Sequence, residues 1–173
     1  MDTAVKMPIS ERINLRLIVF STIALLLLGY PTYVFVTESL TGGVRDHGTF
    51  KEVDLKAMSN FEMDQNDATL DDIPKTFRAL DGQRVMLEGE IYQPFSANDK
   101  VAGFQLCYSI AKCCYSGPPK VQHFVNVRVG EGKTVRVYDN LVRVVGILHV
   151  KIEKENGKIQ SVYSLDVDTV DPL

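Results

Sequence analysis

The sequence contains no tryptophan and only three cysteines and three histidines among its 173 residues. Any aromatic stacking surface must therefore be built from tyrosine and phenylalanine. The net charge is −3, and no stretch is rich in lysine and arginine, so the chain lacks the basic surface with which proteins contact nucleic-acid phosphates. We expect no nucleic-acid partner. The composition, 45% hydrophobic and 24% charged, fits one folded domain with an appendage.

Charged residues are also absent from residues 17–37, LIVFSTIALLLLGYPTYVFVT. At about 1.5 Å per residue a helix of this length spans about 30 Å, the thickness of a bilayer core. Pro31 is tolerated near the end of a membrane span, and Tyr30 and Tyr33 suit a membrane interface. The alternative is a cleaved signal peptide, but its apolar region is normally about 7–15 residues. The sequence predicts a retained transmembrane helix.

The charges on either side of this run predict its orientation. Lys6, Arg12 and Arg16 precede it, whereas the chain beyond it opens with the acidic Glu38. Because cytoplasmic flanks carry an excess of lysine and arginine, we expect residues 1–16 to form a cytoplasmic tail and the rest of the chain to be exported.

Residues 38–72 are expected to form a linker. This segment contains TGG and the acidic stretch MDQNDATLDD, and it has few large apolar residues. We interpret it as extended, with at most a short helix, and assign residues 73–173 to the exported domain.

The exported domain opens with a helical signal and then a turn. Ile73, Phe77 and Leu80 have helical spacing, and Pro74 suits a first helical turn. Asp81 and Gly82 then predict a tight turn.

Alternating apolar residues predict strands over 85–92, 103–108, 123–129, 134–138, 141–152 and 162–170. Gly89 and Gly146 lie inside two of them and indicate bulges or sharp bends. Asn156 and Gly157 predict a hairpin turn. We therefore expect a mainly β domain, a small OB-like barrel or sandwich of five or six strands, preceded by one N-terminal transmembrane helix.

The stretch CYSIAKCCYSGPPKVQHF holds all three cysteines, Cys107, Cys113 and Cys114, together with His123. His149 lies in the long later strand, which barrel closure can bring near. Thiolates and imidazoles are ligands for zinc and Cu(I), so one hypothesis is a metal site formed by these five residues. The spacing is not the Cys-x2-Cys of common zinc sites.

Two other interpretations of the same cysteines remain open. In an oxidising compartment Cys107 can form a disulfide with Cys113 or Cys114, which leaves one thiol. Alternatively, the cysteines are reduced and pack a rigid loop as small apolar residues. A catalytic thiol needs an adjacent base, and His123 and His149 are candidates only by count, so we predict no catalytic residues.

The loop ends in Gly117, Pro118 and Pro119, which force a rigid and extended exit. These three residues are expected to rigidify the loop whatever the state of the cysteines.

Three stretches together, IPKTFRALDGQRVMLEGEIYQP, CCYSGPPKVQHFVNVRV and VVGILHV, resemble the bacterial exported family named domain of unknown function 3299. The resemblance covers Ile73 to Val170, and the Cys-Cys loop ending in Pro-Pro is its most specific part. It implies a secreted, lipid-anchored or membrane-anchored domain in the bacterial periplasm. This chain departs from common members because a transmembrane helix replaces the lipid-bearing cysteine. The family supplies no established activity.

The sequence thus favours a non-enzymatic accessory or binding module, anchored by one helix in the bacterial inner membrane and associated with a membrane protein or complex. The alternative is a protein that handles zinc or copper through the Cys-Cys loop. We expect no other cofactor.

Overall fold

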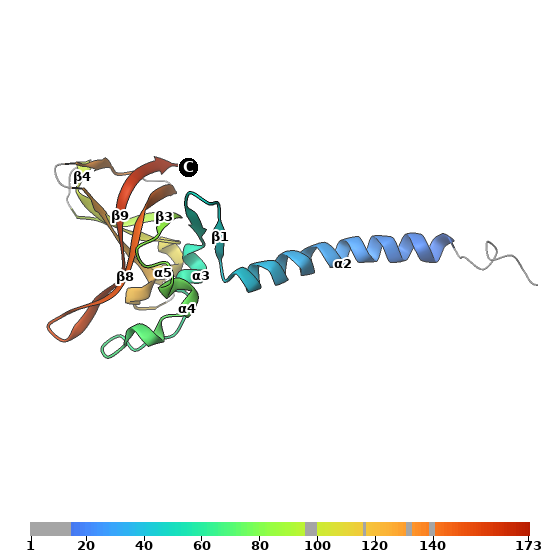
Figure 1. Cartoon of the computed structure of the whole chain (residues 1–173), viewed down its shortest axis with the longest axis horizontal. Coiled ribbons are helices and arrows are strands. Elements are labelled where there is room, and N and C mark those ends of the chain that lie inside the picture. The colour runs from blue at the N-terminus through green and yellow to red at the C-terminus, as the bar shows by residue number, and fades with distance from the viewer. Residues whose placement is uncertain (1–14, 96–99, 116, 131–132, 139–140) are drawn as a thin grey trace, which may run out of the picture. The chain divides into compact units, whose positions relative to one another are not determined.

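The computed structural model describes residues 15–95, 100–115, 117–130, 133–138 and 141–173. The chain divides into two compact units, residues 1–41 and 42–173 (Figure 1). Each unit is described by itself.

The described part of the first unit is helix α2, Leu15–Thr41, with Pro31 inside it. The hydroxyls of Thr22 and Thr32 donate to the main-chain carbonyl oxygens four residues earlier, over 2.8 and 2.6 Å, so these polar groups are satisfied within the helix. Residues Arg16–Val34 have a mean hydropathy of 1.9, and none of them is buried. The helix is long and apolar enough to cross a membrane, a criterion that signal sequences near an N-terminus also meet.

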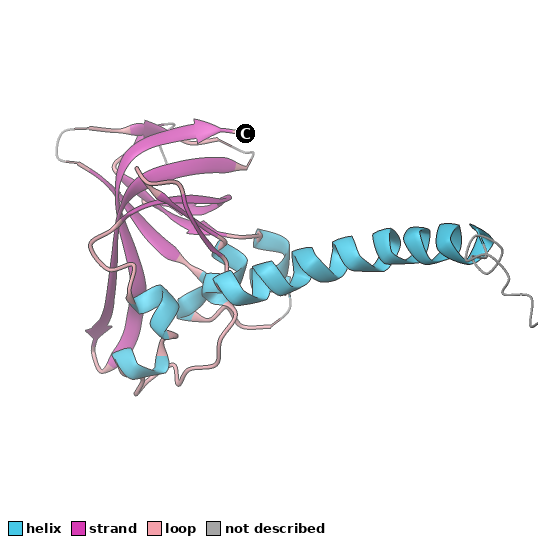
Figure 2. Cartoon of the chain, turned by 45° about the vertical axis from the view of Figure 1, so that its right-hand side comes forward, coloured by secondary structure: helices cyan, strands magenta, loops and turns pink. Residues whose placement is uncertain are grey.

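The second unit is built around a ring of five strands (Figure 2). In their order around the ring they are β3 (Arg84–Pro94), β5 (Gly103–Cys107), β6 (Val125–Val129), β9 (Lys158–Pro172) and β8 (Val142–Glu155). β3 also pairs with β8, which closes the ring. β6 and β9 run parallel, and the other neighbours in the ring run antiparallel. The mainly β fold is confirmed, and the ring is compatible with the predicted OB-like barrel.

Two glycines permit the close approaches that the ring requires. At Gly89 strand β3 leaves β8 and turns to β5, and an added Cβ there would lie 2.4 Å from the carbonyl oxygen of Cys107. At Gly146 the register of β8 and β9 shifts, and an added Cβ would lie 2.3 Å from the carbonyl oxygen of Asp166. Both positions agree with the predicted bends in the two strands.

The second unit includes much of the segment that the sequence analysis assigned to a linker over residues 38–72. β1 (Val44–Asp46) pairs with β2 (Lys51–Val53), and β2 pairs in parallel with the start of β3. Helix α3 (Leu55–Ser59) follows, capped by Asp54, whose side chain accepts from the main-chain N–H groups of the first turn. A 3-10 turn, η1 (Leu70–Asp72), comes later. Burial of a few isolated apolar side chains holds this segment on the barrel.

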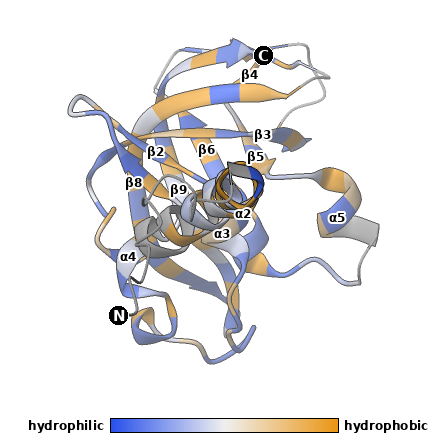
Figure 3. Cartoon of the chain, turned by 90° about the vertical axis from the view of Figure 1, so that its right-hand side faces the viewer, coloured by the Kyte–Doolittle hydropathy of each residue, from blue (hydrophilic) through white to orange (hydrophobic). Residues whose placement is uncertain are grey.

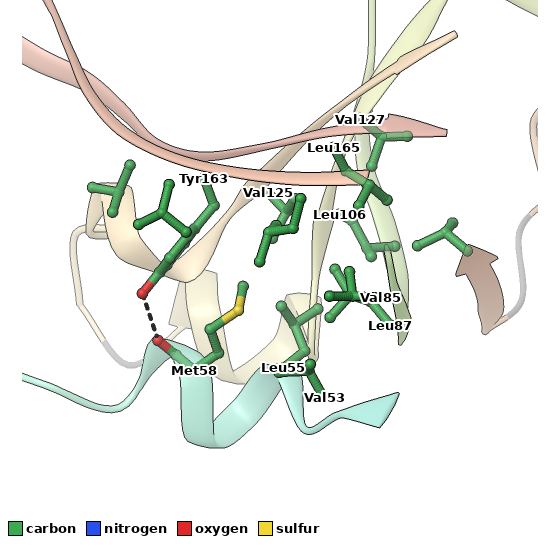
Figure 4. Close-up of a cluster of buried hydrophobic side chains, with 14 of the residues drawn as sticks. Val53, Leu55, Met58, Val85, Leu87, Leu106, Val125, Val127, Tyr163 and Leu165 are labelled. Atoms are coloured by element: carbon green, nitrogen blue, oxygen red, sulfur yellow. Dashed lines mark hydrogen bonds between the residues drawn. The ribbon is translucent and has the colours of Figure 1, made fainter. Parts of the chain in front are cut away.

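Those side chains are Val53, Leu55 and Met58, each at most 3% exposed. They pack with residues from the ring in one continuous core (Figure 4). The strand residues drawn there include Val85, Leu87, Leu106, Val125, Val127, Tyr163 and Leu165. The core therefore joins the N-terminal segment of the domain to its last strand.

Local sequence signals agree with the turns in the structure. Pro74 precedes helix α4 (Lys75–Arg78), and Gly82 has φ +71° in the turn that follows. Asn156 and Gly157, with φ +51° and +78°, form the tip of the β8–β9 hairpin. A separate two-stranded sheet pairs β4 (Lys100–Val101) with β7 (Val135–Arg136). Figure 3 shows the alternation of apolar and polar residues along the strands as orange and blue bands.

Candidate binding site beside the Gly-Pro-Pro segment

The cysteine-rich stretch folds as a short helix, α5 (Ile110–Tyr115), immediately after β5. The N–H of Ile110 donates to the Glu90 carboxylate over 2.7 Å, which ties the start of this helix to β3. Cys107 and Cys113 are 0% and 2% exposed. Cys113 in the helix and Cys107 at the end of β5 are therefore both buried in the domain, which packs the helix onto the barrel.

Cys107 and Cys113 lie close to the Tyr108 phenol. Burial raises the pKa of Tyr108 above its usual value, and the two cysteines add to this effect. The side chain of Cys114 lies outside the described part of the structure. Which cysteines pair, if any, stays a prediction.

The two histidines of the metal hypothesis lie in different surroundings. His123 ends the 3-10 turn η2 (Val121–His123), and its Nδ1 is buried with no hydrogen-bond partner among the residues that the structure describes. Burial, and then the nearby Lys120, lower the pKa of His123 below its usual value. His149, on β8, places Nε2 3.0 Å from a carboxylate oxygen of Asp166.

Within the described ranges no three His, Cys, Asp or Glu side chains gather as a metal site would require. With the Cys114 side chain outside those ranges, the zinc or copper site stays a prediction.

The Gly-Pro-Pro segment leads from α5 to a hollow on the barrel surface. Gly117 has φ +135°, a conformation that favours glycine, and Pro118 and Pro119 are exposed. Pro119 then borders a hollow of about 260 Å³. The lining residues are Tyr92, Gln93, Gln105, Pro119, Lys120, Val121, Phe124, Asn126, Gln160 and Ser161.

Amide side chains form the floor of this hollow. Gln105 on β5 lies opposite Asn126 on β6, and its Nε2 donates to the Asn126 side-chain oxygen over 3.2 Å. Gln93 on β3 lies opposite Gln105 from the other side. The alternation along β5 places Phe104 and Leu106 in the core, so Gln105 points outward. The three amides therefore form a row across three neighbouring strands.

Two aromatic rings adjoin the amides. Tyr92 and Phe124 stack with their ring centroids 5.0 Å apart and their planes at 27°. The register of β3 and β5 shifts between Ile91 and Gln93, so Tyr92 occupies a bulge. A bulge re-aims a side chain, which explains why Tyr92 and Gln93 both contribute to the same surface.

The wall of the hollow is fixed by hydrogen bonds from the segment before α4. Gln122 is 1% exposed; it donates to the carbonyl of Phe61 over 3.0 Å and accepts from Gln65 over 3.1 Å. The N–H of Val121 donates to the Gln65 side chain over 3.0 Å. These bonds hold η2 in place, so this side of the hollow is preformed.

The charge of Lys120 is balanced at the rim. Its ammonium lies 2.9 Å from a carboxylate oxygen of Glu62, and this hydrogen bond lowers the pKa of Glu62. The hollow thus combines amides, a hydroxyl and aromatic rings, which are groups that bind neutral polar molecules.

The sequence analysis singled out Pro119 but not the amides or the aromatic pair of the hollow. Their signal in the sequence is weak: Gln105 and Asn126 are polar residues at outward positions of strands whose other face is apolar, as is common. Only the pairing of β3, β5, β6 and β9 brings the lining residues together.

No protein-family model matches the chain, and no curated protein matches it. Among solved structures the chain is similar to the crystal structure of a DUF3299 family protein from Pseudomonas aeruginosa PAO1. The alignment has a TM-score of 0.50 and 17% sequence identity, and it covers 73% of this chain and 97% of the other. The resemblance to the domain of unknown function 3299 is thereby confirmed at the level of the fold.

Proposed function

We propose that this chain is a non-catalytic accessory subunit of a membrane-protein complex. In this proposal α2 anchors the chain in the bacterial cytoplasmic membrane, and the β domain lies in the periplasm and binds a partner. The observation that carries the proposal is the surface of α2. Its large apolar side chains are exposed, among them Leu25, Leu26, Leu27 and Leu28 at 68–73%, and such a surface is stable in lipid or against another helix.

One face of α2 supports association with another transmembrane helix. A groove along it is lined by Ser21, Ala24, Leu25, Leu28, Gly29, Thr32, Tyr33 and Val36. Small residues on a membrane helix let a second helix approach closely. An added Cβ at Gly29 meets only Leu25 of its own helix, at the ordinary distance of 3.7 Å. A larger residue at Gly29 therefore fits this helix itself and obstructs only a partner.

This difference provides a test in native membranes. The full chain is extracted with a mild detergent, and its complexes are separated by native electrophoresis. Gly29→Phe is compared with Leu27→Phe, which adds the same side chain outside the groove. We expect the wild type and Leu27→Phe to migrate in a larger complex and Gly29→Phe to lose it. Migration of the wild type as a lone monomer, with no co-purifying protein, would refute the accessory role.

The orientation has its own test. The positive flank before α2, Lys6, Arg12 and Arg16, supports a cytoplasmic N-terminus. Protease added to intact spheroplasts should then digest a tag on the C-terminus and spare a tag on the N-terminus. The opposite pattern would reverse the proposed orientation, and loss of the N-terminal tag from the mature chain would indicate a cleaved signal peptide.

A further inference from the structure

We propose that the hollow beside Pro119 is a binding site for one neutral sugar unit of a glycan. This inference goes beyond the accessory role and does not depend on it. It rests on the juxtaposition of a stacked aromatic pair, Tyr92 and Phe124, with a row of amides on three strands.

The charge of the hollow selects against ionic ligands. Among the lining residues that the structure describes, Lys120 is the only one that carries a charge at neutral pH. Its ammonium is engaged by Glu62 at 2.9 Å, so little net field is left to attract a phosphate or a carboxylate. Recognition must then come from hydrogen bonds and from contact with the rings.

The amides match a ligand that is rich in hydroxyl groups. A side-chain amide has two N–H donors and a carbonyl oxygen with two lone pairs. The bond between Gln105 and Asn126 uses one N–H and one lone pair and fixes both side chains, so donors and acceptors remain on the pair. Gln160 adds a further amide from β9, whereas the Ser161 hydroxyl donates to the main-chain carbonyl of Tyr163 over 3.2 Å and offers only its lone pairs. A sugar hydroxyl can donate and accept hydrogen bonds at the same time, so it satisfies both the donors and the acceptors of this surface.

The aromatic pair matches the apolar face of a sugar ring. A pyranose ring has an apolar C–H face bordered by polar hydroxyls, and Tyr92 and Phe124 present apolar ring surface beside the amides. The volume of about 260 Å³ lies below the roughly 300–1,000 Å³ of sites for drug-sized molecules, so it suits a single ring.

The position of the hollow argues against a peptide. An extended peptide binds by adding to the exposed edge of a sheet, where main-chain groups lack partners. Here β5 lies between β3 and β6, and β6 lies between β5 and β9, so the hollow lies on a sheet face. OB-like barrels bind oligosaccharides and oligonucleotides on a sheet face. Lys120 is the one basic residue in the described lining of this hollow and is paired with Glu62, which disfavours an oligonucleotide.

The test uses the full chain in a detergent without a sugar head group, because a maltoside would compete for the site. Calorimetric titrations use maltotriose, cellotriose and tri-N-acetylchitotriose as neutral probes. A trigalacturonate serves as a charged trisaccharide, and an uncharged tripeptide represents the peptide class. We expect at least one neutral trisaccharide to bind, and to bind more tightly than the charged trisaccharide or the tripeptide.

Variants then locate the site. Asn126→Ala removes one of the three amides, and Gln93→Ala removes another, which is exposed, without a loss of core packing. Each should weaken binding about 3- to 10-fold, which corresponds to the loss of one hydrogen bond. Asn66→Ala makes the same kind of change on an exposed residue outside the hollow and should leave binding unchanged. If Asn126→Ala fails to fold, the affinity of Gln93→Ala alone tests whether the ligand binds in the hollow.

Three results would overturn the proposal: no neutral trisaccharide binds, the charged trisaccharide or the tripeptide binds at least as tightly, or Asn66→Ala weakens binding as much as the variants of the hollow. None of them bears on the anchor or on the membrane partner, which are tested on α2.

Discussion

The phenol oxygen of Tyr163, on the last strand, donates a hydrogen bond over 3.3 Å to the main-chain carbonyl of Met58 in α3 (Figure 4). Both residues are fully buried. The bond connects segments 105 residues apart in the sequence and lies inside the core. Because a buried carbonyl without a donor is costly, this contact contributes to the attachment of α3 to the barrel.

Tyr163→Phe should therefore lower the free energy of unfolding at neutral pH by about 1 kcal/mol, since it removes the donor and keeps the ring. The measurement is urea unfolding of the full chain in detergent, followed by near-ultraviolet circular dichroism of the tyrosines. Unchanged stability in this variant would show that another group satisfies the Met58 carbonyl.

The same tyrosine predicts a response to alkali. Burial raises the pKa of Tyr163 above the usual value of about 10, so the folded chain keeps a proton that the unfolded chain releases above that pH. The resulting stabilisation is complete below pH about 10 and decreases as the pH rises further. Stability of the wild type should thus fall more steeply above pH about 10 than that of Tyr163→Phe. Parallel curves for the two proteins would contradict this role of Tyr163.

Gly89→Ala and Gly146→Ala should each destabilise the domain by about 1–3 kcal/mol, because the new methyl group meets main-chain atoms that cannot move freely. Gly130→Ala is the matched control: an added Cβ there has no neighbour within 4 Å in the described part of the chain, and we expect a change of at most about 0.5 kcal/mol. Thermal unfolding of the three variants provides the comparison. Equal effects at all three positions would indicate that the close approaches at Gly89 and Gly146 are not required.

His123 predicts a loss of stability in mild acid. Burial and Lys120 lower its pKa in the folded state, so the unfolded chain binds the proton more readily below the usual pKa of about 6.5. The stabilisation is present above that pH and is lost as the pH falls. Between pH about 7.5 and 5.5 the wild type should lose more stability than His123→Leu, as measured by urea unfolding at each pH. Three carboxylates with lowered pKa values titrate below this pH range and do not contribute to the expected difference: Glu62, Asp64 and Asp72.

The disulfide prediction is tested by intact-mass spectrometry after alkylation in denaturant without reductant. A bond from Cys107 to Cys113 or Cys114 leaves one cysteine to be alkylated. Alkylation of all three would instead favour reduced cysteines that pack α5 onto the barrel.

The metal hypothesis is tested by elemental analysis of the full chain purified under reducing conditions without chelators. It predicts about one equivalent of zinc or copper, lost in Cys113→Ser. Wild-type protein that contains neither zinc nor copper would refute this hypothesis.

Local signals predicted those parts of the fold that local physics determines. The turns at Gly82 and at Asn156–Gly157 need positive φ. Glycine and asparagine adopt positive φ readily, so these residue types predict the turns. The long strands β3, β8 and β9 have enough alternation to be recognised, although β9 begins at Lys158, earlier than the predicted residue 162. Of residues 158–161 only Ile159 is apolar, and one apolar residue is too few to establish an alternation.

The segment before residue 73 shows why other elements of the fold were not predicted from the sequence. β2 has three residues, too few for a period, and its partner β3 lies about thirty residues further along the chain. Leu55 and Met58 are separated by Lys56 and Ala57 in a five-residue helix, and only the core of the barrel explains their burial. In the candidate site, likewise, Gln93, Gln105 and Asn126 come from three strands, and no spacing in the sequence relates them.

The closure of the ring by its last strand has a consequence for biogenesis. β9 supplies one neighbour to β6 and the other to β8, so neither strand completes its pairing until residues 158–172 are available. A chain that is synthesised from its N-terminus therefore exposes unpaired strands until nearly the whole domain is available. Any factor that shields extended chains during this interval should raise the yield of folded protein.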